Sequence, residues 1–174
     1  SFMFRNAKVF DQNISNWNVS NVTTMKYMFY DAEEFDQNIN TQSVTVGEST
    51  YTAWNVSNVK DMSYMFSYTE KFNQNLNDWD VSNVTTMEQM FRYASDFNGN
   101  ITNWVPSSVT DMSQMFFEAA DFNQNIRGWN VSSVTPDSNF GSMFYGTKVA
   151  TNYGAPDGTG SDSGPLIKAW FNMY

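Results

Sequence analysis

Cysteine and histidine are absent from the sequence, and basic residues are scarce. The 174 residues include 9 Lys and Arg against 18 Asp and Glu, so the formal net charge is −9 at pH 7. Without cysteine there is no disulfide and no thiolate chemistry, and without histidine the commonest metal ligand and acid–base group is missing. The charge opposes binding to nucleic acid and to anionic membranes, because both present negative groups. We therefore expect no nucleic-acid partner, no metal and no other cofactor.

Long apolar runs are also absent. No run approaches the ~20 residues that a membrane-spanning helix needs, so the sequence predicts no transmembrane segment within these residues. The first residues, SFMF at 1–4, align with KYMF at 26–29, so the chain begins inside a repeat. Because an uncovered end of a repeat array exposes its apolar interior, we expect the chain to be a segment of a longer protein.

What the sequence does contain is one unit repeated at a fixed spacing. The stretch WNVSNVTTMKYMF at residues 17–29 returns, with changes, at Trp54, Trp79, Trp104 and, in extended form, Trp129. These four later tryptophans are 25 residues apart. A second phrase, FDQNI at residues 10–14, recurs with the same period. A fixed period in this range is typical of a stacked solenoid, here of five coils over residues 1–150.

The pattern within one repeat predicts both a strand and a helix. Trp17 and Val19 flank an outward residue with the two-residue period of a strand. Four later residues have the i, i+3, i+4, i+7 spacing of one helix face: Met25, Met28, Phe29 and Ala32. We therefore expect an α/β repeat in which each 25-residue coil is a short strand plus a short helix, with the recurrent Trp, Phe and Met side chains in its core.

Two polar columns recur beside this pattern. The first column is always asparagine, at Asn13, Asn38, Asn75, Asn100 and Asn125. Since every copy carries it, we interpret it as a structural ladder that satisfies backbone groups at one bend of each coil. The second column is Asp11, Asp36, Asn73, Asn98 and Asn123. We interpret that column as solvated surface, in preference to a cation site.

The outward position of the expected strand gives a candidate contact face. Its residues are Asn18, Asn55, Asp80, Val105 and Asn130. They are small and mostly polar, which suits contact with a protein or a glycan. Asn18, Asn55 and Asn130 also stand in Asn-X-Ser/Thr sequons and are candidate N-glycosylation sites. The alternative is that the repeat itself generates these sequons.

Twelve extra residues, 41–52, separate the first repeat from the second. Two β-prone runs around Gly47 predict a hairpin insertion that protrudes from the regular surface. Its candidate recognition residues are Val44, Val46, Glu48 and Tyr51. Recognition element and tolerated surface loop both remain open, because lengthening a loop has a small entropic cost.

Residues 151–174 depart from the pattern. Residues 154–165 are rich in Gly, Ser, Asp and Pro and predict a linker. Ile167 and Trp170 then reproduce the spacing of Ile14 and Trp17, which favours the start of a sixth coil. The alternative is a short capping helix after Pro165.

The repeated motifs resemble the BspA-like surface leucine-rich-repeat family, which includes the mycoplasma-type surface lipoprotein repeat of about 25 residues. The matching stretches are Met28-Phe29, residues 35–39 and 54–59, and their copies, and the resemblance covers residues 1 to about 150. It implies a leucine-rich-repeat-like solenoid at a cell surface or in a secreted protein, used for adhesion or assembly. No catalytic residue is carried over.

These patterns favour a non-enzymatic extracellular or cell-surface module that mediates adhesion or contacts a protein or a glycan. An alternative is an architectural segment of a filament, sheath or particle coat, with neighbouring subunits as partners. Ice binding would need a regular threonine column, but Thr24 and Thr86 alternate with Asp61 and Asp111. An enzyme is disfavoured because the acids are scattered and form no paired carboxylates, so we expect no catalytic residues.

Overall fold

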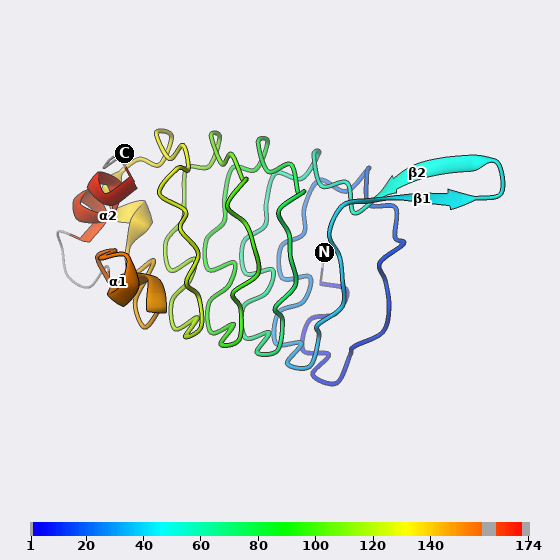
Figure 1. Cartoon of the computed structure of the whole chain (residues 1–174), viewed down its shortest axis with the longest axis horizontal. Helices are drawn as coiled ribbons and strands as arrows, with labels where there is room; N and C mark the ends of the chain where they lie inside the picture. The colour runs from blue at the N-terminus through cyan, green and yellow to red at the C-terminus, as the bar shows by residue number, and fades with distance from the viewer. Residues whose placement is uncertain (1, 158–162, 172–174) are drawn as a thin grey trace.

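The computed structural model describes residues 2–157 and 163–171. Its elements are β1 (Gln42–Val46), β2 (Ser49–Ala53), the 3-10 helix η1 (Asp137–Phe140), α1 (Lys148–Asn152) and α2 (Ser163–Phe171). Most of the remaining chain forms successive turns of backbone that lie one behind another, with the hairpin near one end and the helices at the other (Figure 1). No described helix is both long and apolar enough to cross a membrane.

The expected α/β, leucine-rich-repeat-like solenoid, with a strand and a helix in every coil, is wrong. The strands of the described chain form one small antiparallel sheet, and its α-helices are α1 and α2. None of these elements lies in the repeated stretches that begin at Trp17, Trp54, Trp79 and Trp104. Those stretches consist of turns and irregular backbone, joined by isolated single-residue bridges such as Thr24 to Asp61.

The helical spacing misled because every second backbone N–H in this stretch bonds to the neighbouring repeat, and the others close single turns, such as Met28 N to Met25 O, instead of a continuous helix. The N–H groups of Met25 and Phe29 donate to the carbonyls of Asp61 and Met65, at 2.9 Å each. Tyr27 and Asp31 have φ values of +57° and +58°, in the left-handed region that interrupts a right-handed helix. The apolar residues still face inward, because the turns return them to the same side of the chain.

We call each repeat a layer. The layers begin at Trp17, Trp54, Trp79, Trp104 and Trp129 and comprise residues 17–53, 54–78, 79–103, 104–128 and 129–153. Peptide groups line up in columns across the layers. One such column joins Phe4 N to Met28 O, Phe29 N to Met65 O, Phe66 N to Met90 O, Phe91 N to Met115 O and Phe116 N to Met143 O. A layer therefore completes its backbone hydrogen bonds only through its neighbours.

Aromatic rings form continuous files through the interior. The ring centroids of Trp54, Trp79, Trp104 and Trp129 are 6.3, 6.2 and 5.8 Å apart in succession. Each indole N–H donates to a carbonyl that precedes the tryptophan of the layer in front, as Trp79 Nε1 does to Ile39 O, ahead of Trp54, at 2.9 Å. This bond satisfies the one polar atom of a buried indole, and it explains why tryptophan occupies this position and phenylalanine does not.

The tail closes one end of the stack. Ile167 and Trp170 lie in α2, so the chain does not begin a sixth coil there, and the capping helix is the interpretation that the structure supports. The ring of Phe171 lies 6.5 Å from that of Trp129, and the ring of Trp170 lies 5.3 Å from that of Phe144. Trp170 Nε1 donates to the carbonyl of Tyr153 at 3.0 Å, which fixes α2 to the last layer.

Candidate contact surfaces

The first polar column satisfies its own layer. Each asparagine Oδ1 accepts a hydrogen bond from the backbone N–H two residues later, for example Ser15 N to Asn13 Oδ1 at 2.9 Å. The same bond forms at Asn38, Asn75, Asn100 and Asn125. These are Asx turns. They satisfy the backbone at one bend of each layer but do not join one layer to the next.

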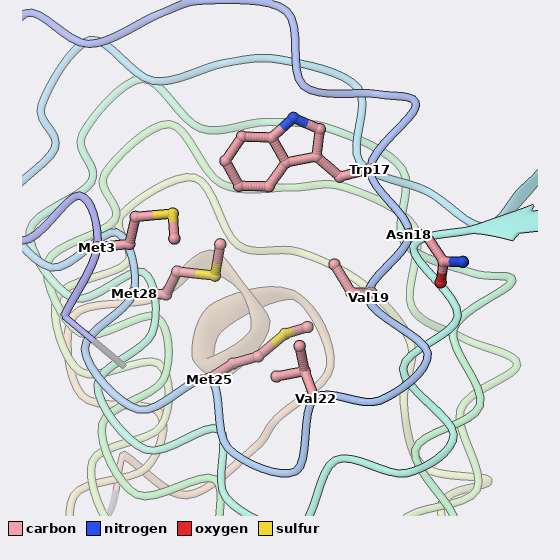
Figure 2. Close-up of a pocket in the computed structure, with 7 residues that line it drawn as sticks. All are labelled: Met3, Trp17, Asn18, Val19, Val22, Met25 and Met28. Atoms are coloured by element: carbon pink, nitrogen blue, oxygen red, sulfur yellow. The ribbon is translucent and has the colours of Figure 1, made fainter.

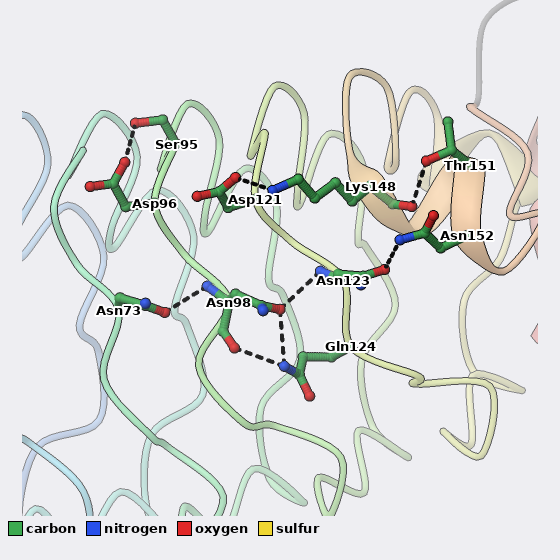
Figure 3. A network of polar contacts seen from close by, with 10 residues as sticks. All are labelled: Asn73, Ser95, Asp96, Asn98, Asp121, Asn123, Gln124, Lys148, Thr151 and Asn152. Carbon is green, nitrogen blue, oxygen red and sulfur yellow. Dashed lines mark hydrogen bonds and ion pairs between the residues drawn. The ribbon is translucent and has the colours of Figure 1, made fainter.

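The second polar column lies at the surface and also connects the layers, which the sequence interpretation did not include (Figure 3). Asn73 Oδ1 accepts from Asn98 N at 2.8 Å, and Asn98 Oδ1 accepts from Asn123 N at 3.0 Å. Asp11 and Asp36 make the same bond in the earlier layers. Asp and Asn are interchangeable here because only an acceptor oxygen is used. That shared property, at the repeat spacing, is the signal that could have identified the column.

The second polar column ends at α1. Asn152 of α1 donates from Nδ2 to Asn123 Oδ1 at 3.0 Å, and Lys148 forms an ion pair with Asp121 (Figure 3). Asn152 therefore supplies, from its side chain, the donor that a following layer would have supplied from its backbone. This contact holds α1 in register with the stack.

The predicted contact face runs across the layers, but its oxygens are already used. Asn18, Asp80 and Asn130 are exposed and Asn55 is half-buried. Each accepts a hydrogen bond from the backbone N–H of the serine two residues later. Val105 is 55% exposed and breaks the polar series. The column is a row of surface turns, and Asn18 and Asn130 are its most accessible sequon asparagines.

The hairpin occupies the predicted insertion and is attached at its base. β1 pairs with β2 in antiparallel register, with Val44 opposite Tyr51. Val44 and Tyr51 are half-buried against the apolar core, and the Tyr51 hydroxyl donates to the carbonyl of Asn16. Val46 is 66% exposed and Glu48 is exposed at the turn. Two of the four candidate residues therefore anchor the hairpin, and two are available at its tip.

A further surface, which the sequence interpretation missed, is formed by aromatic rings that are half-buried or, at Tyr145, exposed. We call it the tyrosine face; it consists of Tyr27, Tyr30, Tyr64, Tyr68, Tyr93, Phe117 and Tyr145. Neighbouring rings from different layers touch: Tyr27 and Tyr64 stack at 4.6 Å, and Tyr68 and Tyr93 at 4.8 Å. The face is continuous across the stack.

Cations lie between these rings. The Arg92 guanidinium is 4.7 Å from the ring centroid of Tyr93 and 5.1 Å from that of Phe117, and Arg92 Nη1 donates to the Tyr68 hydroxyl at 3.1 Å. Arg5 and Lys26 lie against Tyr27. In a chain of net charge −9, positive groups therefore collect on this aromatic surface, held by cation–π contacts.

One tyrosine on the face is strongly perturbed. The Tyr64 hydroxyl donates to Glu88 Oε1 at 2.6 Å. Burial, followed by this hydrogen bond and the charge of Glu88, raises the pKa of the Tyr64 phenol above its ordinary value. Tyr64 is therefore held in its neutral, hydrogen-bonding form.

The tyrosine face was missed because no position carries an aromatic residue in every layer: Tyr27 matches Tyr64 and Tyr68 matches Tyr93, but neither pair continues through the other copies. The positions of Tyr27 and Tyr30 carry Gln89 and Arg92 two layers further on, so no motif marks them. Alternate layers contribute different rings to one surface, and this is visible only once the layers are superposed. A signal was available in the tyrosines themselves, which are more polar than the Phe, Trp and Met residues of the core.

Acidic residues do not gather into a chemical site in the described chain. Within residues 2–157 and 163–171 there is no group of three or more Asp, Glu, His or Cys residues that could hold a metal ion. Several carboxylates are engaged in local structure: Asp61 and Asp111 each accept from the backbone N–H of the serine two residues later, at 2.9 Å.

Comparison with known proteins identifies the family. No curated protein and no solved structure was found to match the chain. A family model matches residues 1–52 and 42–154, which together span all of the layers described above. The chain therefore belongs to the repeat family described as "Mycoplasma protein of unknown function, DUF285".

Proposed function

We propose that this chain is a non-enzymatic module of a cell-surface or secreted protein and that it mediates adhesion by contact with another macromolecule. The tyrosine face is the observation that carries the proposal. Tyrosine and arginine are the residues most often found at the energetic centres of protein interfaces. A relation to the BspA-like surface proteins, indicated by the repeated motifs, belongs to the same proposal.

The geometry of the rings favours a protein as the partner over a glycan. A sugar ring stacks on the open face of an aromatic ring. On the tyrosine face those ring faces are largely occupied, because Tyr68 stacks on Tyr93 and Arg92 lies over Tyr93 and Phe117. Ring edges and polar groups remain for contact, which suits the mixed apolar and polar surface of an extracellular protein.

An experiment can separate the two partner classes. The chain is applied to arrays of extracellular proteins and of glycans. The double variant Tyr68→Ala/Tyr93→Ala is applied beside it, with Asn18→Ala/Asn130→Ala in the row of surface turns as the control. We expect the native chain and the asparagine control to bind protein spots on the array, and we expect the tyrosine variant to lose this binding. Urea denaturation of each variant verifies that it is folded. Loss of binding only in the asparagine control, or binding to glycans alone, would contradict the proposal.

The architectural role is the second candidate. α2 covers one end of the stack, so contacts with neighbouring subunits would have to use the opposite end or the sides. Electron microscopy of the native assembly tests this role, because subunits of a filament or coat would appear in a regular arrangement with that opposite end covered.

A further inference from the structure

Two pairs of tyrosine rings in the tyrosine face stack on one another across neighbouring layers. The ring centroids of Tyr27 and Tyr64 are 4.6 Å apart, with 19° between the ring planes, and those of Tyr68 and Tyr93 are 4.8 Å apart, with 23°. Nearly parallel rings at such a separation have carbon atoms in van der Waals contact, at about 3.5–4.0 Å. The carbons beside the phenol oxygen are the atoms through which two oxidised tyrosines join, so both pairs are placed for such a bond.

The two pairs differ in what lies beside their hydroxyl groups. The Tyr64 hydroxyl donates to Glu88 Oε1 at 2.6 Å and accepts from Gln89 Nε2 at 3.2 Å. The Tyr68 hydroxyl instead accepts from an arginine, and within the described residues neither Tyr68 nor Tyr93 donates to a carboxylate. A phenol loses an electron more readily when a positioned base takes its proton in the same step. Only the Tyr27–Tyr64 pair has that base.

Lys26 makes the base more important. Its Nζ lies 5.5 Å from the ring centroid of Tyr27 and 5.7 Å from that of Tyr64. A positive charge there opposes a ring radical that still carries its proton, because that radical is itself a cation. Transfer of the proton to Glu88 gives a neutral radical at Tyr64, and the hydrogen bond from Gln89 to its oxygen can remain.

Other oxidisable side chains are sheltered or have no ring to join. The chain has no cysteine, and the tryptophans that begin the later layers are at most 4% exposed. Trp17 is half-buried and lines an apolar groove of about 240 Å³ together with Met3 and Met28 (Figure 2). Its described ring neighbour is Phe4, and phenylalanine does not couple by this chemistry. Oxidation at Trp17 therefore leads to no bond between layers.

We propose that Tyr27 and Tyr64 are a site of oxidative cross-linking, at which a one-electron oxidant such as a peroxidase intermediate joins the first layer to the second. Each phenol gives one electron to the oxidant and releases one proton, from Tyr64 to Glu88 and from Tyr27 to water. The two phenoxyl radicals form one carbon–carbon bond between ring positions beside the hydroxyl groups. The hydrogens on those two carbons then move to the oxygens, which restores both phenols. The net loss is two electrons and two protons.

The bond gives a covalent connection to layers that are otherwise held by hydrogen bonds and packing. It closes the stretch from residue 27 to residue 64 into a loop, in a chain that has no cysteine for a disulfide. Such a loop restricts the unfolded chain more than the folded one. We therefore expect the cross-linked chain to unfold at a higher urea concentration than the untreated chain.

Mapping of the cross-link tests the proposal. The native chain is oxidised with a ruthenium photo-oxidant and persulfate, dityrosine is followed by its fluorescence, and joined peptides are identified by mass spectrometry after proteolysis. We expect monomeric protein in which the Tyr27–Tyr64 bond is at least about fivefold more abundant than the Tyr68–Tyr93 bond. Absence of dityrosine, a main product that joins two chains, or an equal yield of the Tyr68–Tyr93 bond would overturn the proposal.

Two matched variants test the role of the base. Glu88→Gln keeps the shape of the side chain but removes the charge that takes the proton, and Glu118→Gln makes the same change in the next layer. We expect the initial rate of Tyr27–Tyr64 bond formation to fall at least about tenfold in Glu88→Gln and to stay unchanged in Glu118→Gln. Urea denaturation verifies that both variants are folded. A native rate in Glu88→Gln, or an equal fall in both variants, would overturn the assignment of Glu88.

Discussion

At the scale of the residue, stability depends on atoms that face the next layer. The second polar column links layers through one acceptor oxygen per copy, and the tryptophan file links them through one indole N–H per copy. What each of these positions requires is therefore a side chain with one donor or acceptor atom placed to reach the next layer. The charge of that side chain matters less.

Asn98 provides a direct test of this acceptor rule. Its Oδ1 accepts from Asn123 N at 3.0 Å and from Gln124 Nε2 at 2.9 Å. Asn98→Ala removes the acceptor from both donors, and we expect a loss of about 1–3 kcal/mol in the free energy of unfolding. Asn98→Asp keeps the oxygen, as Asp36 does, and we expect most of the stability to remain. Urea denaturation measures both; equal losses would contradict the rule.

Gly99 stands where the other copies carry glutamine, and the backbone explains the exception. A Cβ at residue 99 would lie 2.0 Å from the carbonyl oxygen of Gln74, whereas a Cβ at Gly128 would meet nothing within 4 Å. We expect Gly99→Ala to lower the free energy of unfolding by about 1–3 kcal/mol through overpacking and Gly128→Ala to be close to neutral. Thermal unfolding of the two variants, each beside the native chain, provides the comparison.

At the scale of the element, the sequence indicates well which residues are buried and poorly which backbone conformation they adopt. The apolar spacing of Met25, Met28 and Phe29 correctly marked buried residues, all at most 6% exposed. It did not determine a helix, because hydrogen bonds to the next layer replaced the bonds within a helix. The hairpin at residues 41–52 could be located because Gly47, with φ +62°, provides the turn, a local signal that needs no neighbouring layer.

Removal of the hairpin tests whether it is separable from the stack. Deletion of residues 41–52 joins Asn40 to Ala53 and restores the connection found in the other layers. We expect a folded chain that loses at most about 2 kcal/mol, because only Val44 and Tyr51 pack partly on the core. Denaturant unfolding and an amide NMR spectrum measure this, with Tyr51→Phe as the control that removes only the anchoring hydroxyl. A disordered deletion variant would contradict it.

At the scale of the whole molecule, two groups make stability depend on alkaline pH. Burial and Glu88 raise the pKa of Tyr64 above 10.0, and a hydrogen bond from Lys8 to Glu33 raises the pKa of Lys8 above 10.5. The contribution of each group to the free energy of unfolding is complete below its pKa in the unfolded chain and is lost as pH rises toward its pKa in the folded chain.

The candidate surfaces also belong to the scale of the whole molecule. The tyrosine face exists only where layers meet, so the sequence of a single repeat could not reveal it.

We therefore expect the free energy of unfolding to fall as pH rises above about 10. Tyr64→Phe should reduce the slope, because the variant has no phenol to ionise in the unfolded chain. Denaturant curves between about pH 8 and pH 11.5 test this. An unchanged slope in Tyr64→Phe would assign the alkaline loss to other groups.

The identical connection between successive layers has a mechanical consequence. Under tension along the stack, no layer differs greatly from the next in what holds it, so the chain should yield one layer at a time. Each layer of the regular tryptophan period would release 25 residues, or roughly 80–90 Å of extended backbone. The layer at residues 17–53, which carries the hairpin, would release 37 residues. A stretched molecule would then lengthen in steps of one layer and keep its remaining layers intact.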